Sequence, residues 1–350
     1  MLLATSVTNG INTYANPDLA GLSPLQCLDK IIAFCGSLTL RVILARTSAK
    51  ADNFNSETLW YISGDSYYSE AQFIADWVTL AKRYAGTAVI GADLWEQPRG
   101  SATWGTGAST DWDLAAARVG NAILAANPNW LIFVEGIVWG TDLRAVATKP
   151  VKLSVKNHVV YSVVQYSNDN AANTWFTDST FPNNLRTLWN QYYGFIVQQQ
   201  IAPLFVCEFG TNFNYQSDYT WLPMLLNYTV GHFTSATKND LPPGHLGMSW
   251  AFEAINPTSA VGGIVANSDW TTVDYQKMYY LSPFLAPAFT PVDPGAPILT
   301  PNPNATEVYP FPTTTVTMAP TGPIVTYFYT SGNQIVDRSG NTAKFSGINW

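Results

Sequence analysis

Short apolar runs alternate with longer amphipathic stretches along most of this chain, and that alternation limits the fold more than any other feature. The apolar runs are dense in Val, Ile, Leu and Phe, as parallel strands buried on both faces should be. The predicted strands cover residues 40–46, 89–94, 131–136, 159–166, 203–210 and 245–252, and the predicted helices cover residues 70–84, 112–126, 185–199 and 220–231. Strand–helix repeats of this kind predict an α/β fold with a parallel sheet.

The turn after the first predicted strand distinguishes between two such folds. A dinucleotide-binding sheet carries a Gly-x-Gly-x-x-Gly turn there, and this chain has none. Ser109, Thr110 and Asp111 lead into the second predicted helix and suit an N-cap. Six strand–helix units without a phosphate-binding turn predict a (β/α)8 TIM barrel, whose chemistry sits where the strands end.

Charge and hydropathy exclude several classes of partner. The 350 residues include 17 basic and 24 acidic side chains, for a net charge of -7, and no basic cluster occurs. We therefore expect no nucleic-acid partner. No run of eighteen apolar residues exists, so we expect no membrane span. The first four residues lack the positive start and the apolar length of a signal peptide, so we expect any targeting signal to lie outside this sequence.

The cysteines and the glycosylation sequons bear on the compartment. Cys27, Cys35 and Cys207 are odd in number and show no Cys-x-x-Cys spacing, so we expect neither a zinc site nor a disulfide framework, and no cofactor. Asn227 and Asn304 each begin an Asn-x-Thr sequon. Together with a Thr/Pro-rich segment near the end, the sequons favour a secreted, glycosylated protein.

A proline-rich segment divides the chain. Ten prolines fall within residues 287–323, and such a segment predicts an extended linker. We therefore expect a barrel over residues 1–286, a linker over 287–323 and a separate strand-forming segment over 324–350.

Two strand-end segments carry a family resemblance. Residues 91–100 read Gly-Ala-Asp-Leu-Trp-Glu-Gln-Pro-Arg-Gly, and residues 205–211 read Phe-Val-Cys-Glu-Phe-Gly-Thr. They resemble the catalytic Asn-Glu-Pro and Glu-Phe-Gly segments of glycoside hydrolase family 5, a cellulase-type family of (β/α)8 barrels. The resemblance extends from about residue 1 to residue 287. It implies that Glu208 stands at the nucleophile position and Gln97 at the position of the general acid.

Gln97 departs from the family at the residue that the chemistry needs most. A retaining glycosidase requires a carboxylic acid to protonate the leaving oxygen, and an amide has no such proton. Glu96 keeps a carboxyl one residue earlier. Because adjacent side chains of a regular strand face opposite ways, Glu96 is expected to be a poor substitute unless the strand end twists.

Further departures fall at positions where the resemblance implies substrate binding. The chain keeps Arg46 but has Thr47 where the family has histidine, and it keeps Tyr166 but has Val164 in place of another histidine. Glu253 replaces the tryptophan that forms the floor of the family's cleaved-sugar subsite. Because these departures accumulate, the sequence favours an abandoned active site.

Several tryptophans have two open interpretations. They are either core and loop packing or stacking platforms for sugar rings, because an indole face packs well on sugar C–H groups. Trp139 is the one we assign to substrate binding. The full set is Trp60, Trp104, Trp139 and Trp175.

The last residues resemble the opening of the same family. A hairpin over residues 327–336 and the segment 343–350 are similar to the N-terminal hairpin and first barrel strand, whereas the first helix and second strand occur nowhere. We therefore expect an incomplete or permuted barrel in which the tail strand lies beside residues 248–252. The chain is then either a slice of a tandem protein or a permuted unit, and tail exchange between copies would give a head-to-tail homo-oligomer or filament.

Three functions remain open at this point. The departures favour a secreted, non-catalytic structural or assembly module. The alternatives are a carbohydrate-binding protein that uses the old cleft and a β-glucan hydrolase of the cellulose type that acts on O-glycosyl bonds.

Overall fold

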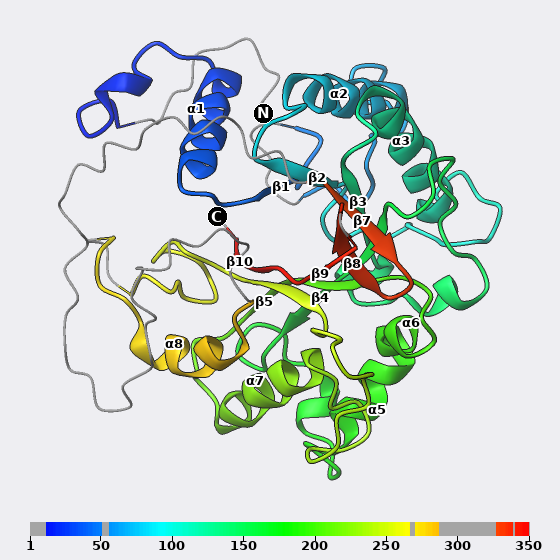
Figure 1. The fold of residues 1–350 in the computed structure, drawn as a ribbon, viewed down its shortest axis with the longest axis vertical. Helices are drawn as coiled ribbons and strands as arrows, with labels where there is room; N and C mark the ends of the chain where they lie inside the picture. Colours follow the sequence, from blue (N-terminus) through cyan, green and yellow to red (C-terminus); the bar gives the residue numbers. More distant parts are fainter. Residues whose placement is uncertain (1–11, 51–55, 267–269, 287–326, 339, 350) are drawn as a thin grey trace. The chain divides into compact units, whose positions relative to one another are not determined.

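The computed structural model describes residues 12–50, 56–266, 270–286, 327–338 and 340–349 (Figure 1). The chain divides into two compact units. The N-terminal unit comprises Met1–Tyr161, Thr317–Thr330 and Val336–Gly340, and the C-terminal unit comprises Ser162–Val316, Ser331–Ile335 and Asn341–Trp350. The predicted linker over 287–323 lies outside the described residues, as does the sequon at Asn304.

The N-terminal unit alternates strands with helices. Strands β1, β2 and β3 pair in parallel, and in Figure 1 α2 and α3 lie side by side next to them. In chain order its elements are η1 (Pro17–Leu19), α1 (Pro24–Ser37), β1 (Val42–Ala45), α2 (Glu70–Arg83), β2 (Val89–Asp93), α3 (Trp112–Ala126), β3 (Leu131–Glu135), α4 (Ile137–Gly140) and η2 (Arg144–Ala147). Strand β4 (Val159–Tyr166) runs across the division between the units.

The C-terminal unit continues the same alternation. Strands β5 and β6 pair in parallel, with Phe205 opposite Ser249. Its helices and strands are η3 (Thr174–Phe176), α5 (Asn184–Trp189), the π-turn η4 (Asn190–Gly194), α6 (Phe195–Gln198), β5 (Leu204–Gly210), α7 (Gln216–Thr229), β6 (Ser249–Phe252), α8 (Tyr275–Leu281), η5 (Ser282–Phe284) and β10 (Ser346–Ile348).

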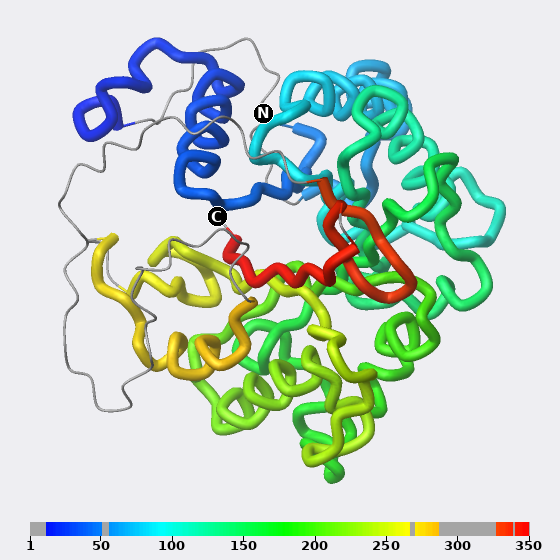
Figure 2. The backbone as a smooth tube through the Cα atoms, viewed as in Figure 1, coloured from blue at the N-terminus to red at the C-terminus, as the bar shows by residue number. Residues whose placement is uncertain are grey.

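The tail strand occupies the position that the sequence predicts. Strand β10 pairs in parallel with β6, with Ser346 opposite Trp250 and Ile348 opposite Phe252. Figure 2 shows this red segment alongside the yellow one. The tail therefore extends its own chain's sheet in this structure. The preceding strands β7 (Phe328–Ser331), β8 (Gln334–Asp337) and β9 (Thr342–Ala343) form a separate three-stranded sheet in that order.

The fold class predicted from the sequence is confirmed. Among the described residues the large sheet has seven strands, ordered β1-β2-β3-β4-β5-β6-β10, so the strand nearest the end of the chain follows the sixth. This alternation of parallel strands with helices is that of a (β/α)8-type barrel with a permuted strand. No helix in the described part of the chain has the length and hydropathy to cross a membrane.

Several element boundaries differ from the prediction. The strand expected over 245–252 begins only at Ser249, and the helix expected over 220–231 spans Gln216–Thr229. The helix expected over 185–199 is interrupted by the π-turn Asn190–Gly194. Asp111 is the N-cap residue of α3, but its carboxylate does not cap the helix. It accepts hydrogen bonds from Thr103, Thr106 and the Gly107 N–H instead.

The helix α1 was missed, although its start carries a sequence signal. Ser23 accepts a hydrogen bond from the Gln26 N–H, and the Gln26 side chain accepts one from the Ser23 N–H. Pro24 occupies the first helical position. A Ser-Pro-x-Gln start of this kind is a capping box with proline at N1, which predicts a helix independently of the apolar spacing.

Candidate active site

Gln97 lies just beyond the end of β2 in an irregular segment. Strand β2 ends at Asp93, and Gln97 has a φ of 52°. The residue is buried, at 6% exposure, and its backbone N–H donates a 2.8 Å hydrogen bond to the Glu135 carboxylate at the end of β3. The left-handed backbone at Gln97 means that the alternation of a regular strand does not hold there. Strand alternation therefore does not decide which way the neighbouring Glu96 side chain faces.

Glu96 stands next to a second acidic group. It is half-buried, and its N–H donates to the Arg46 carbonyl at 2.9 Å. Burial, together with the negative charge of Glu96, raises the pKa of Asp93 well above its usual range. The Oδ1 atom of Asp93 is buried and has no hydrogen-bond partner among the described residues. The carboxyls of Asp93 and Glu96, at the end of β2, therefore interact electrostatically. Asp93 and Glu135 are not among the site residues predicted from the sequence.

Arg46 is held by the helix that follows its strand. Its Nη1 donates to Asp76 of α2 at 2.8 Å, and its guanidinium lies 5.1 Å from the centre of the Phe73 ring. These contacts fix the side chain against α2, so any contact with substrate uses the remaining donors of the guanidinium.

The structure distinguishes among the four tryptophans. Trp60 and Trp104 are buried in the core, at 1% and 6% exposure, whereas Trp139 is 54% exposed. Trp175 is half-buried. The Arg99 guanidinium lies 4.3 Å from the centre of the Trp139 ring, and the backbone N–H of Trp139 donates to the Pro98 carbonyl at 3.2 Å. Trp139 is therefore an exposed platform attached to the same segment that carries Glu96 and Gln97.

Glu208 lies near the end of β5 and is surrounded by hydrogen-bonding groups. It is 7% exposed, and the Tyr166 hydroxyl donates to its Oε1. The same hydroxyl lies 3.0 Å from Oε2 of Glu253. Because a phenol has a single proton, Tyr166 can donate to only one of the two carboxylates at a time. Tyr166, Glu208 and Glu253 thus form one connected cluster at the ends of β4, β5 and β6.

The tail strand helps to position β5. The Asn349 Nδ2 donates to the Cys207 carbonyl at 3.0 Å, immediately before Glu208. On the other side of Glu208, the Ser167 hydroxyl donates to the Gly210 carbonyl at 3.1 Å. Backbone carbonyls on both sides of Glu208 therefore accept hydrogen bonds from side chains that directly follow β4 and β10.

Asn227, the described sequon residue, lies inside α7. Its Nδ2 donates to the Pro223 carbonyl at 2.7 Å, and the residue is half-buried. Attachment of a glycan to that nitrogen would compete with this contact.

Parallel strands with acidic residues at their ends, and an exposed tryptophan beside one of them, are typical of a glycosidase barrel. The family model for cellulase (glycosyl hydrolase family 5) matches residues 3–240. The chain therefore belongs to glycoside hydrolase family 5.

Characterised relatives and solved structures agree with this assignment. An endoglucanase of Paenibacillus polymyxa is 39% identical over 297 residues, covering 81% of this chain and 70% of that protein. The major extracellular endoglucanase of Xanthomonas campestris pv. campestris is 33% identical over 296 residues, covering 80% of this chain and 57% of that protein. A structure of an endocellulase from Pyrococcus horikoshii with cellotetraose has a TM-score of 0.70 at 31% identity, covering 81% of this chain and 79% of that one.

These comparisons change the ranking of functions made from the sequence. They support a glycoside hydrolase, and nothing in them supports the expectation of a non-catalytic module with an abandoned site. The β-glucan hydrolase, one of the two alternatives that the sequence leaves open, fits them better.

Proposed function

We propose that this chain is a β-glucan hydrolase of the cellulose type, which cleaves O-glycosyl bonds within the polysaccharide. The observation that carries the proposal is the buried Glu208 carboxylate near the end of β5, with the Tyr166 hydroxyl donating to it. A carboxylate held in this way is suited to attack an anomeric carbon. Family membership and the named activities of the relatives support the same reaction.

In the proposed mechanism Glu208 forms a covalent glycosyl intermediate. The bond from the anomeric carbon to the leaving oxygen breaks as the bond to the Glu208 carboxylate forms, and water then releases the sugar. The Tyr166 hydroxyl stabilises the attacking carboxylate and keeps it oriented, because it donates a hydrogen bond to Oε1 of Glu208.

We assign proton donation to Glu96. Gln97 stands at the family's acid position, and its side-chain amide has no acidic proton. Glu96 is the neighbouring carboxyl, and the irregular backbone at Gln97 removes the strand constraint that would turn it away.

The assignment is tested with two substrates that differ in leaving group. Cellohexaose needs a proton on its leaving oxygen, whereas an aryl cellobioside with an acidic phenol does not. We expect Glu96→Gln to lower kcat on cellohexaose by roughly 10²–10⁴-fold and to leave the aryl substrate nearly unchanged. Glu208→Gln should abolish both activities. Glu70→Gln, on the outer helix α2 in an ion pair with Arg118, is the matched control and should preserve both.

Equal loss on both substrates in Glu96→Gln, with normal folding, would contradict the role of Glu96. Full activity of that variant on cellohexaose would contradict it as well.

A second candidate function follows from Gln97 itself. An amide at the acid position can hydrogen-bond a sugar but cannot protonate it, which suits a carbohydrate-binding protein. In that case the unmodified chain would bind cellohexaose in calorimetry without releasing reducing ends.

Secretion, glycosylation and head-to-tail assembly remain predictions of the sequence. Export of the full-length gene product, a mass shift on deglycosylation and the size of the chain in solution test them respectively.

A further inference from the structure

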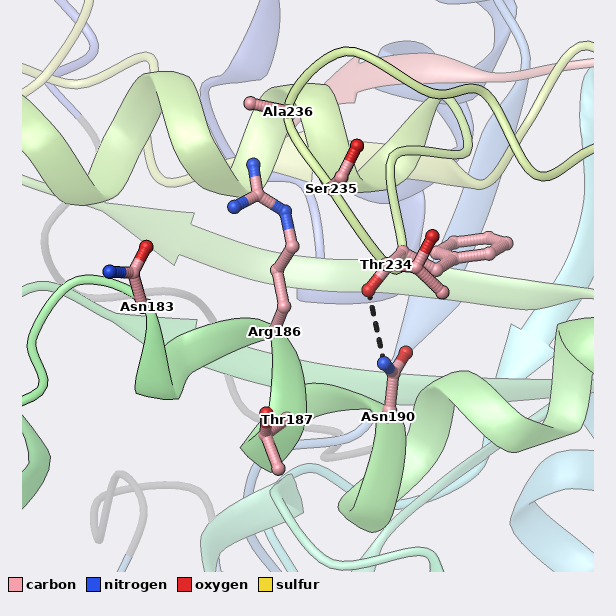
Figure 3. A pocket seen from close by; sticks show the side chains of 8 residues that line it. Asn183, Arg186, Thr187, Asn190, Thr234, Ser235 and Ala236 are labelled. Atoms are coloured by element: carbon pink, nitrogen blue, oxygen red, sulfur yellow. Dashed lines mark hydrogen bonds between the residues drawn. The ribbon is translucent and has the colours of Figure 1, made fainter.

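A pocket on the outer side of α5 is independent of the cluster around Glu208. It has a volume of about 500 Å³, with one wall formed by Asn183, Arg186, Thr187 and Asn190 and the other by residues 233–236 (Figure 3). The Asn190 side chain connects the two walls by donating to the Phe233 carbonyl at 3.0 Å. All of these residues belong to the C-terminal unit.

Arg186 brings an uncompensated positive charge to this pocket. Its Nε donates to the His232 carbonyl at 3.0 Å, which fixes the plane of the guanidinium. Among the described residues no carboxylate pairs with it, and burial alone lowers its pKa. The guanidinium nevertheless stays charged at any physiological pH, so its two terminal nitrogens present up to four N–H donors to a ligand.

The acidic residue closest in sequence to the second wall is already occupied. Asp240 accepts hydrogen bonds from the Thr234 N–H at 2.9 Å and from its hydroxyl at 2.8 Å. Lys238 contacts the same carboxylate at 2.6 Å. The charges of Lys238 and Asp240 thus offset each other, and Arg186 remains the net charge of the pocket.

The rest of the lining is neutral and hydrogen-bonding. It contains the Asn183 amide and the hydroxyls of Thr187, Thr234 and Ser235, and no acidic residue. Amides and hydroxyls of this kind pair with the hydroxyls of a sugar, whereas a planar guanidinium pairs with a carboxylate through two parallel hydrogen bonds.

We propose that this pocket binds a sugar acid, with the carboxylate on Arg186 and the ring hydroxyls on the neutral side chains. A single cation matches the single charge of a uronate better than the double charge of a phosphate monoester, which usually draws several cations. The volume accommodates one monosaccharide. The pocket is therefore a subsite for uronate-bearing polysaccharide, and its existence does not depend on whether Glu208 cleaves glucan.

The test places a competing carboxylate in the pocket without removing Arg186. Ala236 is exposed and lines the second wall, and Figure 3 shows it beyond the end of the Arg186 side chain. Ala236→Asp supplies an internal partner for the guanidinium, and Ala236→Asn is its neutral counterpart of nearly equal size. The probe is methyl β-D-glucuronoside, titrated by calorimetry at low ionic strength.

We expect saturable binding in the millimolar range to the unmodified chain and to Ala236→Asn. Ala236→Asp should weaken it at least tenfold, and so should Arg186→Gln, with thermal unfolding confirming that the variants are folded. Methyl β-D-glucoside should bind at least tenfold more weakly than the glucuronoside, because it lacks the carboxylate.

Three results would overturn the proposal. One is no saturable binding of the glucuronoside by the unmodified chain. Another is equal affinity in Ala236→Asp and Ala236→Asn. The third is that inorganic phosphate or acetate binds as tightly as the glucuronoside, which would mean that the pocket recognises a small oxyanion and not a sugar acid.

Discussion

Removal of residues 341–350 should severely destabilise the chain, because this segment makes hydrogen bonds to backbone N–H and carbonyl groups of the neighbouring strands. The Trp250 N–H donates to the Phe345 carbonyl, the Ile255 N–H donates to the Asn349 carbonyl, and the Asn349 N–H donates to the Phe252 carbonyl, each at 2.9 Å. The Asn349 side chain adds the bond to the Cys207 carbonyl. Truncation therefore leaves four backbone groups of β5, β6 and the residues that follow β6 without these partners.

The size of the effect can be worked from these bonds. A buried polar group left unpaired costs about 1–3 kcal/mol, so four of them cost roughly 4–12 kcal/mol. Phe345 is 8% exposed, and loss of its burial adds about 2 kcal/mol. Water that reaches the exposed edge of β6 will hydrogen-bond some of these groups and bring the cost of leaving them unpaired toward the lower end of this range. Even about 4 kcal/mol is a large part of the 5–15 kcal/mol that keeps a typical domain folded.

The assay is thermal unfolding followed by circular dichroism, with size-exclusion chromatography of the same samples. We expect the truncated chain to aggregate or to melt far below the full chain. Asn349→Ala, which removes only the bond to Cys207, should cost about 1–2 kcal/mol and also lower any hydrolytic activity through the Glu208 segment. Ile348→Ala, at a side chain that is 38% exposed, is the control. A truncated protein that stays monodisperse with an unchanged melting midpoint would refute the reasoning.

Three further changes test other parts of the structure. Burial lowers the pKa of Lys344 in the folded chain from 10.5 to about 8. Between these two pH values the unfolded chain binds more protons than the folded chain, so the free energy of unfolding rises with pH. Lys344→Met should flatten that rise and add roughly 1–3 kcal/mol at pH 7, and an unchanged pH profile in denaturant titrations would contradict the buried charge. Gly194→Ala should destabilise by about 1–3 kcal/mol, because a Cβ there would lie 1.8 Å from the Tyr228 hydroxyl oxygen. Adding Tyr228→Phe should recover part of the loss in the same melts, and no recovery would argue against this clash. Tyr166→Phe should lower kcat roughly 10-fold or more with a smaller change in KM, since it removes the donor to Glu208. Steady-state kinetics that show a change in KM alone would mean that Tyr166 binds substrate without supporting the nucleophile.

The sequence predicted the architecture because buried parallel strands leave a strong local signal. Runs of Val, Ile, Leu and Phe mark β2, β3 and β5 to within a residue or two, since both faces of such strands must be apolar. The resemblance located Glu208, Gln97 and the tail strand, whose pairing with β6 was expected from the family's strand order. Boundaries failed where tertiary contacts override local preference, as at the π-turn Asn190–Gly194, which packs its glycine against Tyr228.

The details of the site depend on contacts that no local pattern encodes. Strand alternation argued against Glu96, but the backbone at Gln97 is left-handed, and its N–H is bound to Glu135 from another strand. The sequence could not distinguish the buried Trp60 from the exposed Trp139, because an indole serves a core and a sugar platform equally well.

What the sequence by itself determined is therefore the order of strands and helices and the residues at the strand ends, because these follow from hydrophobic periodicity and motif spacing. Only the tertiary structure decided that the Tyr166 hydroxyl lies between Glu208 and Glu253, and that Arg186 faces a neutral pocket. Both depend on residues distant in the chain meeting at a particular distance and orientation. Those distances are set by packing of the whole C-terminal unit, and no segment of the sequence specifies them alone.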